Sequence, residues 1–276
     1  VKLSGLLAPS FYALHRETAE KAYSHYWLKA GRGSTKSSFI SLELVLGIMR
    51  DAQRQKHTSA IVFRRYGVTL RESVYEQIAW AIEKLGVGSL WQGNVSPMQF
   101  VYRPTGQKIL FRGIDSPAKL KSVKVSRGYL KYTWFEEINE LESPDKLRSI
   151  LQSVNRGGKE FINFFSYNPP RDPGNWVNRY VQSAPPDTRI HHSDYRSVPK
   201  EWLGERFLAE AAHLQQANPV LYRHEYLGEA VGCGGTVFEN LELRPITDEE
   251  ISRFDCLRRG IDWGYAADPF HYTVCH

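Results

Sequence analysis

One run of eleven residues constrains the fold of this chain more than any other: Leu28-Lys29-Ala30-Gly31-Arg32-Gly33-Ser34-Thr35-Lys36-Ser37-Ser38. It follows an aromatic, strand-like segment, Tyr23 to Leu28, and opens a helix-like segment, Ser38 to Met49. A Gly- and Ser-rich turn that ends in Lys-Ser at such a junction predicts a phosphate-binding loop. Backbone N–H groups and the helix N-terminus face the anion, the lysine reaches the β- and γ-phosphates, and the hydroxyl binds Mg²⁺.

The run departs from the general phosphate-loop pattern at two positions. G-x-x-x-x-G-K-[ST] has glycine where this chain has Ala30 and Thr35. The charge of Lys36 and the hydroxyl of Ser37 are kept, so we expect the loop to bind ATP with Mg²⁺. Thr35 must then adopt a glycine-like backbone conformation or reshape the loop. The predicted nucleotide-binding residues are Ala30, Gly31, Arg32, Gly33, Ser34, Thr35, Lys36, Ser37 and Ser38.

A second motif, Tyr132-Thr133-Trp134-Phe135-Glu136-Glu137, is an apolar strand that runs into two carboxylates. In an NTPase the first carboxylate helps to hold Mg²⁺, and the second orients and polarises the attacking water. In an open α/β sheet this motif and the phosphate loop both lie at the carboxyl ends of strands, where ligands bind. Taken alone, the motif is also compatible with a strand that ends in solvated acids.

A third motif, Phe164-Phe165-Ser166-Tyr167-Asn168-Pro169-Pro170, predicts a strand that ends in small polar groups. Beside a γ-phosphate, such groups could sense whether the phosphate is present. The alternative is a proline-stiffened turn with local side-chain hydrogen bonds. Aromatic residues near the N-terminus are candidates to stack on the base, and the sequence does not choose among them: Phe11, Tyr12, Tyr23 and Tyr26.

Charge and composition narrow the choice of partners. The net charge of +6 favours a polyanionic partner, weakly. Between Arg103 and Lys131 eight basic residues accompany one acid, Asp115, which suits contact with phosphate backbones unless the run is a solvated face. Arg127 in this run is our candidate for an arginine that reaches a neighbouring subunit's γ-phosphate. Three cysteines without a C-x-x-C pair argue against a disulfide framework and a structural zinc site.

Strand-like and helix-like segments alternate along most of the chain, which predicts an α/β fold with a mainly parallel sheet flanked by helices. No apolar run approaches the roughly 18 residues of a membrane span, so we expect no membrane partner. Arg259 to Tyr265 and Phe270 to Cys275 predict a late strand hairpin, which by itself is marginally stable. A carboxylate on its first strand, Asp262, could hold Mg²⁺ or Mn²⁺, but taken alone it is better explained as a structural aspartate at a strand end.

Five stretches together resemble the large terminase subunit of tailed bacteriophages and related prophages. They are AGRGSTKSS, WFEEINEL, FSYNPP, NPVLYRHEYLGEAVGCGGTVFEN and GIDWGYAADP, in that order over nearly the whole chain. The resemblance implies a DNA-packaging motor, in which a P-loop ATPase is followed by a nuclease domain of ribonuclease-H type. It implies Mg²⁺ or Mn²⁺ for the nuclease. It further implies double-stranded DNA, the portal protein and the small terminase subunit as partners, a ring of subunits at the portal, and a location in the host cell cytoplasm.

The resemblance also implies roles for single residues. Lys36 and Ser37 would contact phosphate and Mg²⁺, and Arg32 would be the phosphate-loop arginine. Glu136 and Glu137 would be the Walker B pair, with Glu137 as the catalytic carboxylate, although Glu136 replaces the more common aspartate. Two further roles would be the coupling of hydrolysis to movement by Ser166, Tyr167 and Asn168, and the first nuclease metal ligand, Asp262.

On this basis we divide the chain into three parts. Residues 1–230 would be the ATPase domain with an N-terminal leader and a C-terminal helical subdomain, 231–256 a linker, and 257–276 the start of an incomplete nuclease domain. Because the other nuclease carboxylates would lie beyond His276, we expect this chain to cut DNA poorly or not at all. Two other functions remain open: another nucleic-acid ATPase, such as a helicase or remodeller, and a nucleotide-binding scaffold whose loop Thr35 has disabled.

Overall fold

The computed structural model describes residues 2–115, 125–232, 244–263 and 270–275. The chain divides into two compact units, Val1–Gly234 and Gly235–His276, and each is described by itself. The domain boundaries at residues 230 and 256 that the sequence suggests stay a prediction.

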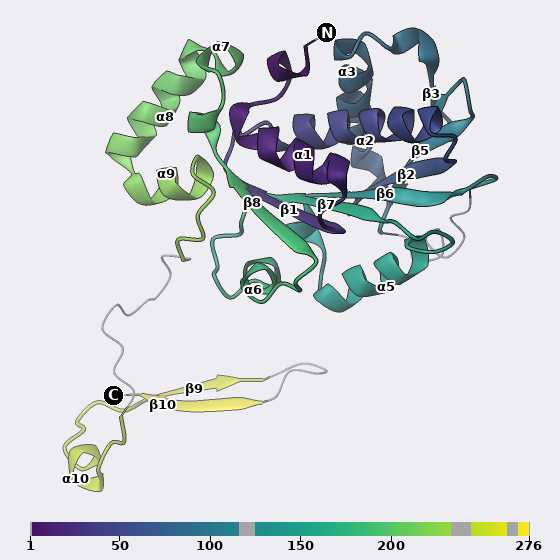
Figure 1. The fold of residues 1–276 in the computed structure, drawn as a ribbon. Coiled ribbons are helices and arrows are strands. Elements are labelled where there is room, and N and C mark those ends of the chain that lie inside the picture. The colour runs from purple at the N-terminus through teal and green to yellow at the C-terminus, as the bar shows by residue number, and fades with distance from the viewer. Residues whose placement is uncertain (1, 116–124, 233–243, 264–269, 276) are drawn as a thin grey trace. The chain divides into compact units, whose positions relative to one another are not determined.

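The first unit contains a sheet of eight strands in the order β3-β4-β5-β2-β6-β7-β1-β8 (Figure 1). From β5 to β8 all neighbours in this order are parallel, and β3 and β4 join antiparallel at one edge. The expected α/β fold with a mainly parallel sheet is therefore confirmed. The strands are β1 (His25–Ala30), β2 (Thr58–Arg64), β3 (Trp91–Val95), β4 (Met98–Tyr102), β5 (Gln107–Gly113), β6 (Tyr129–Glu136), β7 (Ile162–Tyr167) and β8 (Thr188–Ser193).

Helices cover both faces of this sheet, as a mainly parallel sheet requires. Figure 1 shows α1, α2 and α3 on one face and α5 and α6 on the other, with α7 to α9 grouped beside β8. The helices are α1 (Tyr12–Glu20), α2 (Lys36–Gln53), α3 (Glu76–Lys84), α5 (Pro144–Val154), α6 (Trp176–Gln182), α7 (Lys200–Leu203), α8 (Glu205–Ala217) and α9 (Pro219–Glu225).

The core forms two large clusters, one on each face of the sheet, because successive side chains of a strand point to opposite faces. In β1, for example, Leu28 belongs to the cluster that includes Phe39 and Ile48 of α2, and its neighbour Trp27 belongs to the other cluster. A small third cluster joins α8 and α9 through Tyr222 and Tyr226. Both faces of the central strands are thus apolar, and polar side chains gather at the strand ends.

One strand end and one helix start differ from the sequence expectation in ways that matter for the site. The third motif predicts a strand that ends at its small polar groups, but β7 spans Ile162–Tyr167, so Ser166 and Tyr167 lie inside the strand. Helix α2 begins at Lys36 rather than at Ser38. The edge strand β3 was not predictable from its sequence, because it contains Gly93 and Asn94, residue types that are rare in strands.

The second unit contains α10 (Asp248–Ile251) and the antiparallel pair β9 (Arg258–Asp262) and β10 (His271–Cys275). Thr247 and Glu250 form a capping box at the start of α10, inside the segment expected to be a linker. The expected hairpin is present, with Asp262 opposite His271.

Candidate active site

Three neighbouring parallel strands bring the predicted motifs together. β7 lies between β6 and β1 in the sheet, so the loop after β1, the carboxylates after β6 and the polar residues after β7 lie at the same edge. Parallel strands place all their carboxyl ends at one edge, which is the usual ligand crevice of such a sheet. The sheet order thus assembles three motifs that lie far apart in the sequence.

The loop between β1 and α2 contains left-handed backbone, both at a glycine, Gly33, and at Thr35. Gly33 has φ +73°, and Thr35, which caps the start of α2, has φ 62° and ψ 19°. Left-handed backbone costs an ordinary residue about 1–2 kcal/mol, and β-branched residues tolerate it poorly. Thr35 therefore adopts the glycine-like conformation itself, and the loop keeps its course at the cost of local strain.

Lys36, the first residue of α2, contacts the end of β7. Its Nζ donates a hydrogen bond of 2.5 Å to Oδ1 of Asn168. Burial lowers the pKa of Lys36, and the carboxylates of Glu137 and Glu136 oppose that effect. The ammonium group is thus withdrawn from water and held between an amide and two acids, a position from which it can bind an anion.

Glu136 ends β6 in a mostly buried position. Ser37 Oγ donates to Glu136 Oε1 at 3.4 Å, and Arg64 Nε at the end of β2 lies 3.3 Å from Glu136 Oε2. Burial is the main cause that raises the pKa of Glu136 to about 7, while the charge of Arg64 lowers it. Within the described residues, neither Glu136 Oε2 nor Arg64 Nε has a hydrogen-bond partner. Buried charged groups left this way have capacity for a ligand.

Glu137 follows directly and leaves the strand direction. Its backbone is left-handed, with φ 53° and ψ 52°, and it precedes the short 3₁₀ helix Ile138–Glu140. Strained non-glycine residues of this kind cluster at functional sites, where the surrounding structure over-determines them. The turn separates the two adjacent carboxylates, so that Glu137 does not continue along the edge of the strand.

Of the three residues of the predicted coupling motif, Ser166 and Tyr167 lie in the core, and only Asn168 lies at the site. Ser166 is fully buried and its Oγ accepts a hydrogen bond of 2.9 Å from Trp134 Nε1, which fixes neighbouring strands β6 and β7 together. Tyr167 is also fully buried and packs edge-on against Trp27. Asn168, the first residue after β7, is the member that contacts Lys36.

Arg32 contacts the helical subdomain instead of joining Lys36. Its backbone N–H donates to the carbonyl of Glu225 at 2.8 Å, and its Nε lies 3.6 Å from Glu225 Oε2. The Arg32 side chain is 62% exposed. The neighbouring Gly31 is packed so closely that a Cβ there would lie 2.0 Å from the carbonyl oxygen of Tyr226, and Gly228 packs closely on Ala30. The end of α9 thus covers the loop.

The remaining predicted residues lie elsewhere or outside the described part. Arg127 is exposed and precedes β6, at the opposite end of that strand from Glu136, so it is not part of the site of its own chain. Asp262 ends β9, and its side chain lies outside what the structure describes, as do Lys119, Lys121 and Lys124 of the basic run. Two suggested base-stacking residues, Phe11 and Tyr26, are fully buried in the core and cannot stack on a ligand.

Arg64 is the site residue that the sequence analysis missed. The run SAIVFRRY predicts a buried strand with basic residues at its end, and Arg64 is the first of them. Its partner Glu136 follows from the pairing of β2 with β6, which are not consecutive in the sequence. The sequence of β2 therefore shows a basic residue at the end of a buried strand, but it does not show that β6 is the neighbouring strand.

The oxygen ligands at this edge suit Mg²⁺, which prefers carboxylate, hydroxyl and phosphate oxygens. Ser37 Oγ and Glu136 Oε1 supply two such groups, and the unsatisfied Glu136 Oε2 fits a further polar partner. Within the described residues, three or more His, Cys, Asp or Glu side chains do not cluster as a protein-only metal site would require. A metal here would thus depend on the ligand's own oxygens. Among the same residues, every helix is too short or too polar to span a bilayer.

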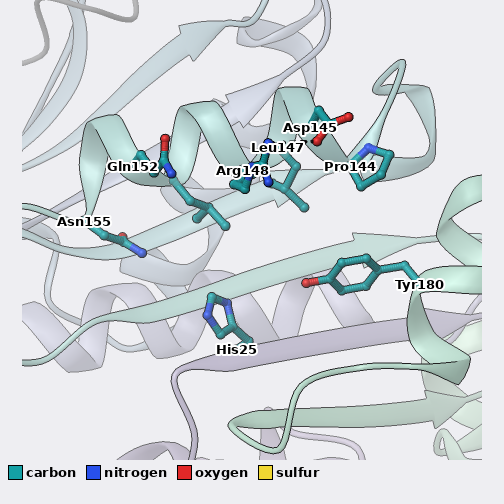
Figure 2. A pocket seen from close by; sticks show the side chains of 9 residues that line it. His25, Pro144, Asp145, Leu147, Arg148, Gln152, Asn155 and Tyr180 are labelled. Atoms are coloured by element: carbon teal, nitrogen blue, oxygen red, sulfur yellow. Dashed lines mark ion pairs between the residues drawn. The ribbon is translucent and has the colours of Figure 1, made fainter.

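A cavity of about 530 Å³ lies at the other end of β1 (Figure 2). Figure 2 shows His25 and Tyr180 across from side chains of α5. Burial lowers the pKa of His25, which favours its neutral form. The cavity shares no residue with the loop, and it lies at the amino ends of the strands. We therefore place the candidate active site at the Lys36 edge.

Comparisons with known proteins agree with this architecture. The family model of the phage terminase large subunit matches residues 23–229. The large terminase subunit of Bacillus phage SPP1 is 38% identical over 284 residues, which cover 100% of this chain and 66% of that protein. The PBSX phage terminase large subunit of Bacillus subtilis (strain 168) is 27% identical over 263 residues, 88% of this chain and 58% of that protein. The chain thus spans less than two thirds of the length of these relatives.

Solved structures show the same fold at low sequence identity. The large terminase of bacteriophage HK97 matches with a TM-score of 0.58 and 13% identity, over 81% of this chain and 50% of that one. The ATPase domain of the Thermus phage P74-26 large terminase matches with a TM-score of 0.53 and 13% identity, over 79% and 92%. Fold, motif order and sequence identity agree, and the chain belongs to the phage terminase large-subunit family.

Proposed function

We propose that residues 1–230 are the ATP-hydrolysing part of a motor that moves double-stranded viral DNA into a procapsid. One observation carries the proposal: Lys36, Glu136, Glu137 and Asn168 lie at the carboxyl ends of three neighbouring parallel strands, beside a loop with glycine-like backbone. The family membership supports it. The large terminase of a thermophilic bacteriophage, which shares the fold at TM-scores of 0.59 and 0.60, has been solved in complex with ADP and with ATP-gamma-S.

In this proposal the loop residues 30–38 hold the phosphates. Their backbone N–H groups and the α2 N-terminus supply partial positive charge, and Lys36 supplies a full charge. Ser37 and Glu136 would hold Mg²⁺, which would offset the negative charge that develops on the phosphates during transfer. Arg64 lies beside Glu136 and keeps that carboxyl partly ionised despite its burial, because its charge lowers the pKa of Glu136.

Glu137 would act on the attacking water. A carboxylate that accepts a proton from water, or aligns it, contributes typically about 10²- to 10⁴-fold to a rate. Asn168 would report the state of the site, because its bond to Lys36 competes with a phosphate for the same ammonium group. Its neighbours Ser166 and Tyr167 lie in the core strand, so a change at Asn168 would act on the sheet.

The other roles are proposed on the family relationship. The partners would be double-stranded DNA, the portal protein and the small terminase subunit, in a ring of subunits in the host cell cytoplasm. Arg127, away from the site of its own chain, would reach a neighbour's γ-phosphate. β9 and β10 would begin the nuclease domain of the full protein, with Asp262 binding Mg²⁺ or Mn²⁺.

ATP turnover in the presence of DNA tests the proposal. Glu137→Gln should lower turnover about 10²- to 10⁴-fold while nucleotide binding is kept. Glu142→Gln is the matched control, because Glu142 is an exposed carboxylate that pairs with Lys146 and Arg65, neither of which belongs to the site. It should turn over ATP like the parent.

Three results would contradict the proposal. Equal turnover in Glu137→Gln and the parent would remove Glu137 from catalysis. A parent that binds no nucleotide would favour the scaffold with a disabled loop. ATP-driven separation of DNA strands, without translocation along intact duplex, would favour a helicase.

A further inference from the structure

Arg65 is a cation close to the candidate active site, and the proposed function gives it no role. It directly follows Arg64, the last residue of β2, and β2 lies between β5 and β6 in the sheet. Its guanidinium Nη1 donates a hydrogen bond of 2.7 Å to the backbone carbonyl of Glu140. Glu140 ends the 3₁₀ helix that begins directly after Glu137. Arg65 therefore connects the end of β2 to the turn that carries the proposed catalytic carboxylate.

One further backbone hydrogen bond extends this connection to Glu137. The Glu140 N–H donates to the Glu137 carbonyl at 2.9 Å, while the Glu140 carbonyl accepts from Arg65. Glu137 has left-handed backbone, with φ 53°, which the surrounding structure must hold in place. Trp176 Nε1 donates to the next carbonyl of the turn, that of Leu141, at 2.6 Å. Two side chains thus hold successive carbonyls, and Arg65 holds the residue that is hydrogen-bonded to Glu137.

The position of Arg65 is itself fixed by its neighbours. Its carbonyl accepts a hydrogen bond of 3.0 Å from the N–H of Asp115, two residues after the end of β5. Its guanidinium lies over the ring of Tyr66, 5.1 Å from the ring centroid. The guanidinium is planar and permanently charged, so it can present a donor to the Glu140 carbonyl in a defined direction.

The hydrogen bond to Glu140 is better suited to positioning the turn than to stabilising the fold. The Arg65 side chain is 38% exposed, and Arg65 and Glu140 line the same cavity of about 200 Å³. Water can therefore replace the guanidinium at this carbonyl, but a water molecule has no covalent link to β2. The contact of Arg65 Nη2 with Glu142 Oε1 is long, 3.9 Å, and an exposed ion pair of this kind contributes little.

We propose that Arg65 is a positioning residue for ATP hydrolysis, which holds the turn after β6 so that the Glu137 carboxylate faces the attacking water. The inference rests on the proposed role of Glu137 and extends it to a residue outside the site. Arg65 acts through the backbone of Glu140 and contacts none of the reacting atoms. Its loss should displace the carboxylate, and a displacement of about 1 Å can lower a rate about 10²-fold.

Steady-state ATP turnover of single and double variants tests this role. Arg65→Ala should lower kcat about ten- to hundredfold and leave the KM for ATP within about twofold of the parent, because an interaction of the transition state is weakened. In a Glu137→Gln background, the same change should alter kcat by less than about twofold, since the group that Arg65 positions is already absent. Arg65→Lys should lower kcat less than Arg65→Ala does, because its ammonium group can still donate to Glu140.

Arg189→Ala is the matched control for the loss of an arginine side chain. The Arg189 side chain is 39% exposed, close to the value for Arg65, and it pairs with Glu17 of α1. Its kcat should equal that of the parent. Thermal denaturation checks that each variant is folded. If Arg65→Ala does not fold, Arg65→Lys in the parent and in the Glu137→Gln background provides the same comparison.

The outcomes separate the inference from the proposed function. If Glu137→Gln lowers turnover and the Arg65 variants keep the parent's kcat, Arg65 has no positioning role. An equal loss of kcat with and without Glu137 would also overturn the inference, because Arg65 would then act independently of that carboxylate. If Glu137→Gln alone kept the parent's turnover, the proposed function itself would be wrong, and the inference with it.

Discussion

Two buried groups of charged side chains lie at opposite ends of the same sheet, and they differ in how fully they are paired. At the amino end of β6, Lys131 Nζ donates to both carboxylate oxygens of Asp51 at 2.9 and 2.8 Å. Tyr132 and Thr58 donate to the same carboxylate at 2.9 and 2.8 Å. At the carboxyl end of β6, Glu136 and Arg64 form an ion pair whose facing atoms have no hydrogen bond among the described residues.

The difference indicates that the group around Asp51 stabilises the fold, whereas the group at the Lys36 end is suited to binding a ligand. Both oxygens of the Asp51 carboxylate are hydrogen-bonded within the protein, so this carboxylate has no capacity left for a ligand, and its contacts fix α2, β2 and β6 in one arrangement. The Lys36 end keeps unsatisfied groups and strained residues, Thr35 and Glu137. That combination costs stability and persists where a function needs it.

The largest expected effect is a loss of stability when the Asp51–Lys131 pair at the amino end of β6 is broken. Lys131→Met leaves the Asp51 carboxylate buried without a counter-charge, so the free energy of unfolding should fall by about 3–5 kcal/mol. Chemical denaturation measures this fall. The double variant Asp51→Leu with Lys131→Met should recover only part of the loss, because both charges are then absent but Tyr132 and Thr58 lose their acceptor. A single variant as stable as the parent would show that the pair does not hold these elements together.

Replacing Lys36, at the carboxyl ends of the strands, should weaken ATP binding and leave stability nearly unchanged. Lys36→Met should weaken ATP binding about ten- to hundredfold, the usual worth of a hydrogen bond to a charged group. Its free energy of unfolding should stay within about 1 kcal/mol of the parent, because burial already disfavours the ammonium form. Calorimetric titration and denaturation on one preparation measure both quantities. Lys146→Met, at an exposed pair, is the control for binding. If Lys36→Met lowered the free energy of unfolding as much as Lys131→Met does, the two groups would not differ in their contribution to stability, and the comparison would be wrong.

Glu136 predicts a pH dependence of stability. Because the pKa of Glu136 is raised to about 7, the folded protein binds this proton more tightly than the unfolded chain does. Stability should therefore fall as pH rises from about 4.5 to about 7. Glu136→Gln removes this slope, so it should be more stable than the parent by about 1–3 kcal/mol at pH 8 and nearly equal at pH 4. Parallel stability profiles of the two proteins across this range would refute the prediction.

The smallest effect concerns the strained loop. Thr35→Gly should raise the free energy of unfolding by about 1 kcal/mol, because glycine relieves the left-handed strain but loses more entropy on folding. Thr35→Ala keeps the strain and should bring no gain. Thermal denaturation of the three proteins measures the difference. If the alanine variant gained as much as the glycine variant, the strain at Thr35 would not be the cause.

The motifs were predictable from the sequence where one segment carries the whole signal. The run from Ala30 to Ser38 combines glycine, lysine and serine at a strand-to-helix junction, and Glu136 and Glu137 directly follow an apolar run. Each pattern lies within one segment, so it can be recognised without knowing the order of the strands in the sheet. The α/β class followed in the same way from the alternation of segments.

Contacts between non-consecutive elements were not predictable. Arg64 meets Glu136 because β2 pairs with β6, and Arg32 meets Glu225 because α9 returns to the loop. Ser166 was expected at a strand end, but the strand extends through Tyr167 because the apolar run continues on both faces. Each of these contacts depends on how distant segments pack, which a one-dimensional pattern does not contain.

The close approach of Gly31 to Tyr226 and of Gly228 to Ala30 has a consequence for synthesis. Residues around Gly31 leave the ribosome well before those at Glu225 and Gly228. Until the later segment emerges, Arg32 N–H lacks its acceptor and the loop lacks its cover. If the loop binds nucleotide as we propose, a nascent chain should acquire this affinity only after α9 has folded.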